Sequence, residues 1–382
     1  MKRYHQRLLR AHKNLDAECR NRNGKIFISD WYCDHPFLNE IIPIDCRGEI
    51  SDKLLMDYYF QNDHEKLRLE ILQFHKSRTE MDYSIDNIFV SSGLTPLITS
   101  QMILLLRKGV KKIFYLKPLY YIYYFLADTF GIELIPVNDR FDITNFKKLS
   151  LPNIQQAVLI MSDPIWCTGS YNSSEVIEAI RSWQKVTKSI VIVDGAFQYQ
   201  RWSDNYLPES TSTLLTDFTI RNVCPTKSVA IHGPRFAYAI LPKAMYEEQR
   251  YCYSNSCGSG SAFDFQSSLS IMEWLNKSPA DTKLLRFIQN RYNKLVESSI
   301  ISDPIGASAS YFCFIEKSFC DDCCLAMDQA FFDLDEYPGM VRFNILLRKH
   351  ELTRFIDIVC EYSGIDPTSN ERLKNDILQL YT

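Results

Sequence analysis

The chain has 382 residues, of which 46% are apolar and 23% charged, and its 43 basic side chains nearly balance its 46 acidic ones. A chain of this length can bury one large and one smaller hydrophobic core. The formal net charge of −3 provides no basic field for a nucleic acid, and no block of like charges forms a tail. We therefore expect neither a nucleic-acid-binding protein nor a small binding module.

The first residues and the hydropathy pattern predict a cytoplasmic protein. Residues 1–20 are polar and lack the apolar centre of a secretory signal. Charged residues interrupt the most apolar stretches, around residues 102–106 and 114–130. Both fall short of the roughly 20 apolar residues that a membrane span needs, so no membrane association is expected.

The twelve cysteines are expected to be reduced thiols in that setting. Cys320, Cys323 and Cys324 include a C-x-x-C pair, and Cys313 lies upstream. A structural zinc needs four ligands, usually from two such pairs, and no second pair lies at a suitable spacing. We expect no metal site, and the role of this cysteine cluster stays open.

The middle of the chain alternates short β-rich runs with amphipathic segments. Strands separated by helical patterns of about 10–15 residues indicate βαβ units and a mostly parallel sheet flanked by helices. The predicted strands are 87–91, 112–116, 132–137, 157–161, 189–193, 218–223 and 236–241, and the predicted helices are 94–108, 121–130 and 174–187.

The pattern changes beyond residue 242. A long helical stretch at 265–297, interrupted by Pro279, precedes strand-like runs at 311–315 and 340–346 and a helix at 350–362. Such an order is typical of a smaller α+β unit. We predict a large α/β domain over residues 45–245, and a small α+β domain from residues 1–44 and 246–382.

Candidate functional residues follow the predicted strands, where an open α/β sheet binds its ligands. The turn at 91–95 opens a helix, so it either offers backbone N–H groups to a phosphate or is capped by Ser92 or Thr95. Tyr120 follows the second strand, although core packing also explains it. Asp194 ends a strand too apolar to solvate it, so its carboxylate needs a cationic or hydrogen-bonding partner.

Further fragments complete an ordered set between about residues 58 and 342. They are 58–68 (YYFQNDHEKLR), 163–169 (DPIWCTG), 224–227 (CPTK), 233–235 (GPR) and 339–342 (GMVR). With Asp194, this set resembles the class I/II aminotransferases, a family of fold-type I pyridoxal-phosphate enzymes. The resemblance implies a seven-stranded-type α/β sheet, pyridoxal 5'-phosphate as cofactor, and an L-amino acid and a 2-oxo acid as substrates.

The resemblance also implies a role for each matching residue. Lys227 would form a Schiff base with the cofactor and move the substrate's proton, and Asp194 would pair with the ring nitrogen. Arg342 would bind the substrate α-carboxylate through its planar donors, with Arg348 as the competing choice. The remaining cofactor contacts would come from Gly93, Leu94, Thr95, Tyr120, Trp166, Phe197, Thr226, Arg235 and, from a neighbouring subunit of a homodimer with shared active sites, Tyr58.

Two departures from the family pattern leave the reaction open. Trp166 and Phe197 stand where the family has side chains that bond the cofactor's phenolic oxygen. An alternative is therefore a pyridoxal-phosphate-dependent elimination, replacement, cyclisation or oxidation on the same scaffold. A non-catalytic binding protein is the third possibility, which Lys227, Asp194 and Arg235 together argue against. The aromatic segment 31–37 either reaches the site or, as we prefer, serves packing, and the substrate's identity cannot be inferred.

Overall fold

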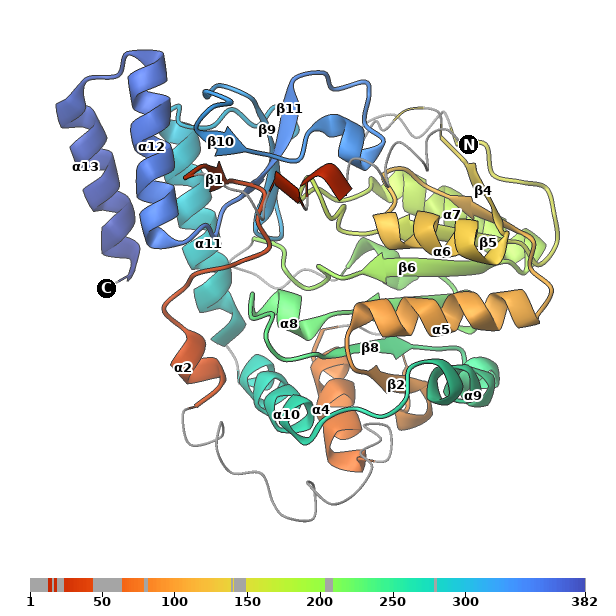
Figure 1. The fold of residues 1–382 in the computed structure, drawn as a ribbon. Coiled ribbons are helices and arrows are strands. Elements are labelled where there is room, and N and C mark those ends of the chain that lie inside the picture. Colours follow the sequence, from red (N-terminus) through yellow and green to blue (C-terminus); the bar gives the residue numbers. More distant parts are fainter. Residues whose placement is uncertain are drawn as a thin grey trace.

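A seven-stranded sheet forms the centre of the protein (Figure 1). The structure is a computed structural model that describes residues 13–15, 17–18, 24–43, 64–78, 82–138, 140, 149–202, 209–277 and 280–381. The strand order is β2-β8-β7-β6-β5-β3-β4, and β8 runs antiparallel to both of its neighbours. The strands are β2 (Ile88–Ser91), β3 (Lys112–Tyr115), β4 (Glu133–Pro136), β5 (Val158–Ser162), β6 (Ile190–Gly195), β7 (Thr219–Val223) and β8 (Ala237–Ile240). The predicted, mostly parallel α/β sheet is confirmed.

Helices cover both faces of the sheet because alternate residues of each strand point to opposite sides. Ile160 and Ile192 pack in one core with α5 (Leu94–Arg107) and α6 (Tyr121–Phe130). Their strand neighbours, such as Leu159 and Val191, pack in another core with α7 (Ser174–Thr187). Burial on both faces explains why these strands are continuous apolar runs rather than alternating ones.

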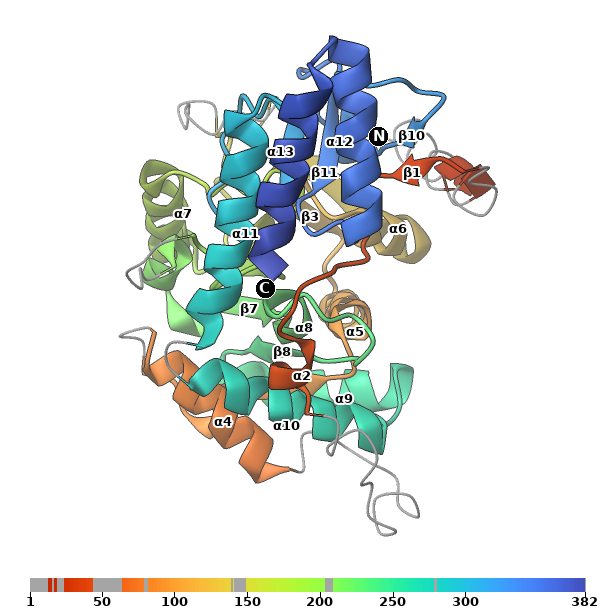
Figure 2. The ribbon, with the colours of Figure 1, turned by 90° about the vertical axis from the view of Figure 1, so that its left-hand side faces the viewer.

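The C-terminal part combines helices with a small antiparallel sheet. The predicted helix at 265–297 is two helices, which end and begin on either side of Pro279, because proline removes a backbone donor. The elements are α9 (Tyr246–Ser256), α10 (Ala262–Asn276), α11 (Ala280–Glu297), the paired strands β9 (Phe312–Glu316) and β11 (Met340–Asn344), α12 (Lys349–Ser363) and α13 (Pro367–Leu378). In this part of the chain, α9 and α13 were not predicted. Figure 2 shows α11, α12 and α13 side by side.

The N-terminal segment crosses the molecule between these parts. It runs from β1 (Ile26–Phe27), which pairs with β10 (Cys324–Leu325), to α2 (Leu38–Ile41), which lies beside α10 (Figure 1). Asn344 of β11 holds it in the middle, because its Nδ2 donates to the carbonyls of Asp30 (2.9 Å) and Tyr32 (2.7 Å). The remaining elements are α4 (Glu65–Lys76), α8 (Pro225–Ser228) and 3-10 turns at Ile85–Asn87, Ser210–Thr213, Thr216–Phe218, Lys243–Met245, Gln329–Phe332 and Gln379–Tyr381.

Gly169 joins the turn after β5 to the segment that leads into β9. Its φ of +66° is in the left-handed region, and a Cβ there would lie 2.5 Å from the carbonyl oxygens of Ala309 and Phe312. We expect Gly169→Ala to lower the free energy of unfolding by roughly 2–4 kcal/mol, measured by urea denaturation. Gly109→Ala is the matched control, with φ +80° but no atom within 4 Å, and should lose about 1 kcal/mol. Equal losses for the two variants would show that the close approach at Gly169 is not destabilising.

Candidate active site

The carboxyl ends of the central strands open into one cavity of about 320 Å³. Residues that are distant in sequence meet there because parallel strands end at the same edge of a sheet. Most of the predicted site residues line this cavity: Gly93, Leu94, Thr95, Tyr120, Trp166, Asp194, Phe197, Thr226, Lys227 and Arg235. Tyr58 lies outside the described residues, and Arg342 does not line the cavity.

Lys227 projects into the cavity from α8, the short helix that follows β7. Its Nζ lies 4.1 Å from the ring centroid of Trp31 and 5.4 Å from that of Phe197. Within the described ranges, no hydrogen bond or salt bridge engages this amine. Burial lowers the pKa of Lys227 to about 8. A buried amine that loses its proton this readily is available as a nucleophile and as a base near neutral pH.

Asp194 lies at the end of β6, with only 3% of its surface exposed. The Ala196 amide donates to its Oδ1 over 3.3 Å. Burial raises the pKa of Asp194 to about 6, while this amide and the charge of Lys227 act in the opposite direction. The group therefore remains mostly ionised at neutral pH, and its carboxylate faces the cavity as a partner for a cationic ligand group.

The N-terminus of α5 faces the cavity beside a basic side chain. Gly93, with φ +103°, is the N-cap of this helix, and no side chain caps the first turn. A Cβ at Gly93 would come within 3.0 Å of Arg235 Nη2, so the missing side chain lets the guanidinium lie against the turn. The Ser92 Oγ is buried and finds no partner in the described structure. Side-chain capping by Ser92 or Thr95 is thus not observed, while free N–H groups beside an arginine suit a phosphate.

Aromatic rings form the other walls. Trp166 stacks on Trp31 with centroids 6.1 Å apart and meets Tyr120 edge-on at 5.2 Å. The Trp166 Nε1 is buried and has no hydrogen-bond partner among the residues with known positions. Tyr199, a nearby hydroxyl in the sequence, instead pairs with His75 Nδ1 at 3.0 Å and does not line the cavity. Trp166 therefore lines the cavity and carries a buried N–H without a partner among the described residues.

Arg342 lies behind one of these walls. It comes from β11, is completely buried, and donates from Nη2 to the Ser29 carbonyl over 2.7 Å. Its Cζ lies 4.1 Å from the ring centroid of Trp31. Trp31 lines the cavity, whereas Arg342 does not. Burial lowers the pKa of Arg342 to about 10. The competing Arg348 lies 3.6 Å from the ring centroid of exposed Tyr32.

Six residues that line the cavity were not predicted as site residues: Trp31, Tyr121, Ala196, Cys224, His232 and Phe236. Trp31 was assigned to packing, yet it lines the cavity as well as packing against other rings. His232 lies on the segment between Lys227 and Arg235, and that position was the signal that could have identified it. Its Nε2 lies 3.2 Å from Tyr311 Oη and 3.5 Å from Cys33 Sγ. Trp31 and His232 add to the functional surface around Lys227.

The described part of the chain contains no group of three His, Cys, Asp or Glu side chains arranged to hold a metal ion. Nor is any helix within the described ranges long and apolar enough to cross a membrane.

Residues 49–298 match the family described as aminotransferase class I and II. This match covers more than half of the sequence, and the chain therefore belongs to that family of pyridoxal-phosphate-dependent transferases of fold type I. The resemblance stated from the motifs is confirmed. No curated protein sequence matches the chain.

Solved structures show the same fold at low sequence identity. A Thermus thermophilus aspartate aminotransferase double mutant gives a TM-score of 0.74 at 13% identity, with 93% of this chain and 96% of that chain covered. N-succinyldiaminopimelate aminotransferase from Mycobacterium tuberculosis gives 0.73 at 16%, with 90% and 94% covered. An Escherichia coli protein with a methionine aminotransferase function gives 0.71 at 15%, with 95% and 96% covered.

Proposed function

We propose that the protein binds pyridoxal 5'-phosphate in this cavity and transfers an amino group between an L-amino acid and a 2-oxo acid. The observation that carries the proposal is that Lys227 and Asp194 face the same cavity from neighbouring strand ends. An amine with a lowered pKa and a buried, ionised carboxylate are the two groups that this chemistry requires.

The residues around the cavity fit this cofactor. Arg235, Thr226 and the free N–H groups at the start of α5 would hold its phosphate. Asp194 would pair with the protonated ring nitrogen, and Tyr120 would lie against the ring. The partnerless Nε1 of Trp166 provides a donor for a ligand oxygen. When bound, pyridoxal phosphate supplies an aldehyde that bonds to amines and a ring that withdraws electrons from the substrate's α-carbon.

The protein's own contribution is to bind the substrate and move its proton. Lys227 would accept the proton from the α-carbon and return it, a task for which a pKa near 8 is suited. Arg342 would hold the α-carboxylate with its Nε and Nη1, which have no hydrogen-bond partner within the described residues, provided that the substrate reaches it past Trp31. Asp194 would maintain the positive charge of the cofactor ring throughout.

The alternative chemistry also has an observation in its favour. Phe197 lines the cavity without a polar atom, and Trp166 offers only one N–H, so the usual pair of phenol-oxygen partners is not reproduced. Elimination, replacement, cyclisation or oxidation of an amino acid on the same scaffold would use Lys227 and Asp194 in the same way.

Product analysis separates the two reactions. We expect the purified protein, loaded with pyridoxal phosphate and given an amino acid alone, to accumulate pyridoxamine phosphate and the matching 2-oxo acid. Return of the cofactor to its aldehyde form without a second substrate would support the alternative. The family resemblance also leads us to propose a homodimer, so light scattering on the same sample should give twice the chain mass of 44.6 kDa. A monomeric mass would contradict the shared active site.

A further inference from the structure

Two cysteines begin and close a tight turn between β9 and β10. The Cys323 amide donates to the carbonyl of Cys320 over 3.1 Å, and the Cys324 amide donates to the same carbonyl over 3.2 Å. A turn closed in this way keeps its first and fourth α-carbons within about 7 Å of each other. Disulfides join α-carbons that are about 4.4–6.8 Å apart. The backbone therefore brings Cys320 and Cys323 to about the separation that a disulfide needs.

The three thiols of this turn differ in exposure. Cys320 and Cys323 are partly exposed, whereas only 3% of the surface of Cys324 is exposed. Burial raises the pKa of Cys324 to about 12, and the nearby thiols of Cys323 and Cys320 act in the same direction. A thiol must lose its proton before it can attack a disulfide, so Cys324 is unreactive near neutral pH. The accessible pair is therefore Cys320 and Cys323.

The turn is bonded to the N-terminal segment. Lys25 Nζ donates to the carbonyl of Asp321 over 3.0 Å, and the Ile26 amide donates to the carbonyl of Cys323 over 3.0 Å. The second bond belongs to the pairing of β1 with β10, which lie side by side in Figure 1. Each of these strands is only two residues long. The position of β1 therefore depends on the turn that leads into β10.

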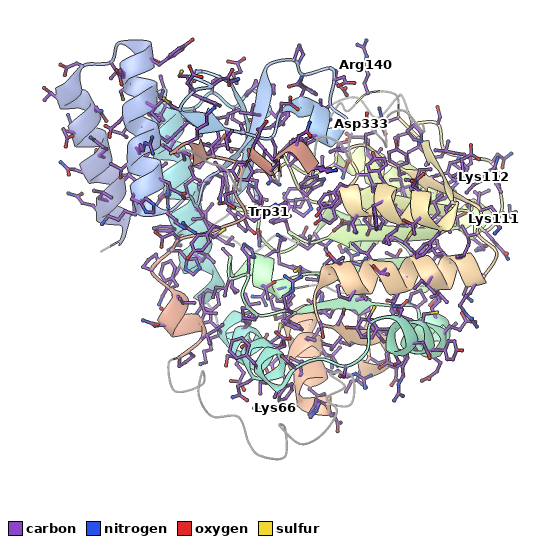
Figure 3. All side chains as sticks on the ribbon, in the orientation of Figure 1. Trp31, Lys66, Lys111, Lys112, Arg140 and Asp333 are labelled. Carbon is purple, nitrogen blue, oxygen red and sulfur yellow. The ribbon has the colours of Figure 1, made fainter. Side chains whose placement is uncertain are left out.

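The same segment continues from β1 to the candidate site. Ser29 Oγ accepts from the Met327 amide over 2.8 Å, and two residues further along Trp31 lines the cavity. Figure 3 labels Trp31 near the middle of the molecule. The turn at Cys320 and Cys323 thus anchors the beginning of a segment whose continuation forms part of the cavity wall.

We propose that Cys320 and Cys323 are a reversible disulfide site, oxidised by a small-molecule disulfide such as oxidised glutathione, and that the closed link secures β1 against β10. One thiolate attacks the oxidant and releases one glutathione thiol, and the other cysteine attacks the resulting mixed disulfide and releases the second. The two hydrogens and two electrons that the cysteines lose are gained by the two glutathione molecules. The link reduces the freedom of the opened turn, so separation of β1 from β10 costs more free energy.

Thiol mapping of the full-length protein tests the site. After incubation in mixtures of oxidised and reduced glutathione, blocking with a maleimide and digestion, mass analysis should find a link between Cys320 and Cys323. An excess of reduced glutathione should remove it. Cys323→Ser should instead retain one glutathione on Cys320, because no second thiol completes the exchange. Cys257→Ser, which removes a partly exposed thiol at the end of α9, should form the same link as wild type.

Hydrogen exchange tests the effect of the link on β1. Peptides that cover residues 24–30 should exchange roughly two- to fivefold more slowly in the oxidised protein than in the reduced one. Cys323→Ser given the same treatment should show no such difference. A turn that stays unmodified at the highest content of oxidised glutathione, or a link from it to any other cysteine, would overturn the disulfide site. Equal exchange of residues 24–30 in the two states would overturn the role of the link in securing β1.

Discussion

Replacing Lys227 by alanine is expected to lower the rate of amine transfer by about 10⁴-fold or more, because the same amine serves as nucleophile and as base. Lys227 has a lowered pKa and lies in the cavity, and no second lysine is among the described residues that line it. No other described lysine is therefore placed to replace it. Borohydride reduction of the wild type followed by peptide mass analysis should find the cofactor on Lys227. The alanine variant should carry no covalent label.

Lys243→Ala provides the control, because this lysine is exposed and does not line the cavity. It should keep wild-type activity and labelling. The pH dependence gives a second check on the same amine. Since only the neutral amine attacks an aldehyde, the rate of cofactor attachment should rise as the pH approaches about 8 and level off above it. A label on another lysine, or activity in the Lys227 variant, would remove Lys227 from its assigned role.

The sequence predicts the central sheet well because burial on both faces leaves a strong signal. The strands β5 and β6 appear as short apolar runs bounded by turn residues, whereas β7 also buries Arg221 and Asn222. The reversed direction of β8 leaves no comparable mark, because a fully buried strand has the same composition whether it is parallel or antiparallel. Helix α9 was missed because its sequence, YEEQRYCYSNS, is largely polar and only a few of its residues are buried.

The residues of the candidate site also differ in whether a local sequence pattern places them. The sequence could place Asp194 and Lys227 near one another because Asp194 lies at the end of one recognisable strand and Lys227 shortly after another, and the sheet edge brings strand ends together. Trp31 could not be placed in this way, since its position beside Lys227 depends on contacts between the N-terminal segment and β11, which no local pattern predicts. For the same reason, the burial of Arg342 behind the indole only became apparent from the fold.

Replacing Asp194 by alanine is expected to reduce turnover by several orders of magnitude while cofactor binding persists weakly, because phosphate contacts remain but the ring nitrogen loses its charged partner. Visible absorbance should report the cofactor, and single-turnover assays the rate. Asp163→Asn is the matched control, a buried carboxylate at the end of the neighbouring strand whose oxygens accept from Asn172 and Ser210 and do not face the cavity. Asp163→Asn should lower the free energy of unfolding but leave the turnover rate close to that of wild type. Activity near wild type in Asp194→Ala would mean that this carboxylate balances charge within the fold rather than serving the reaction.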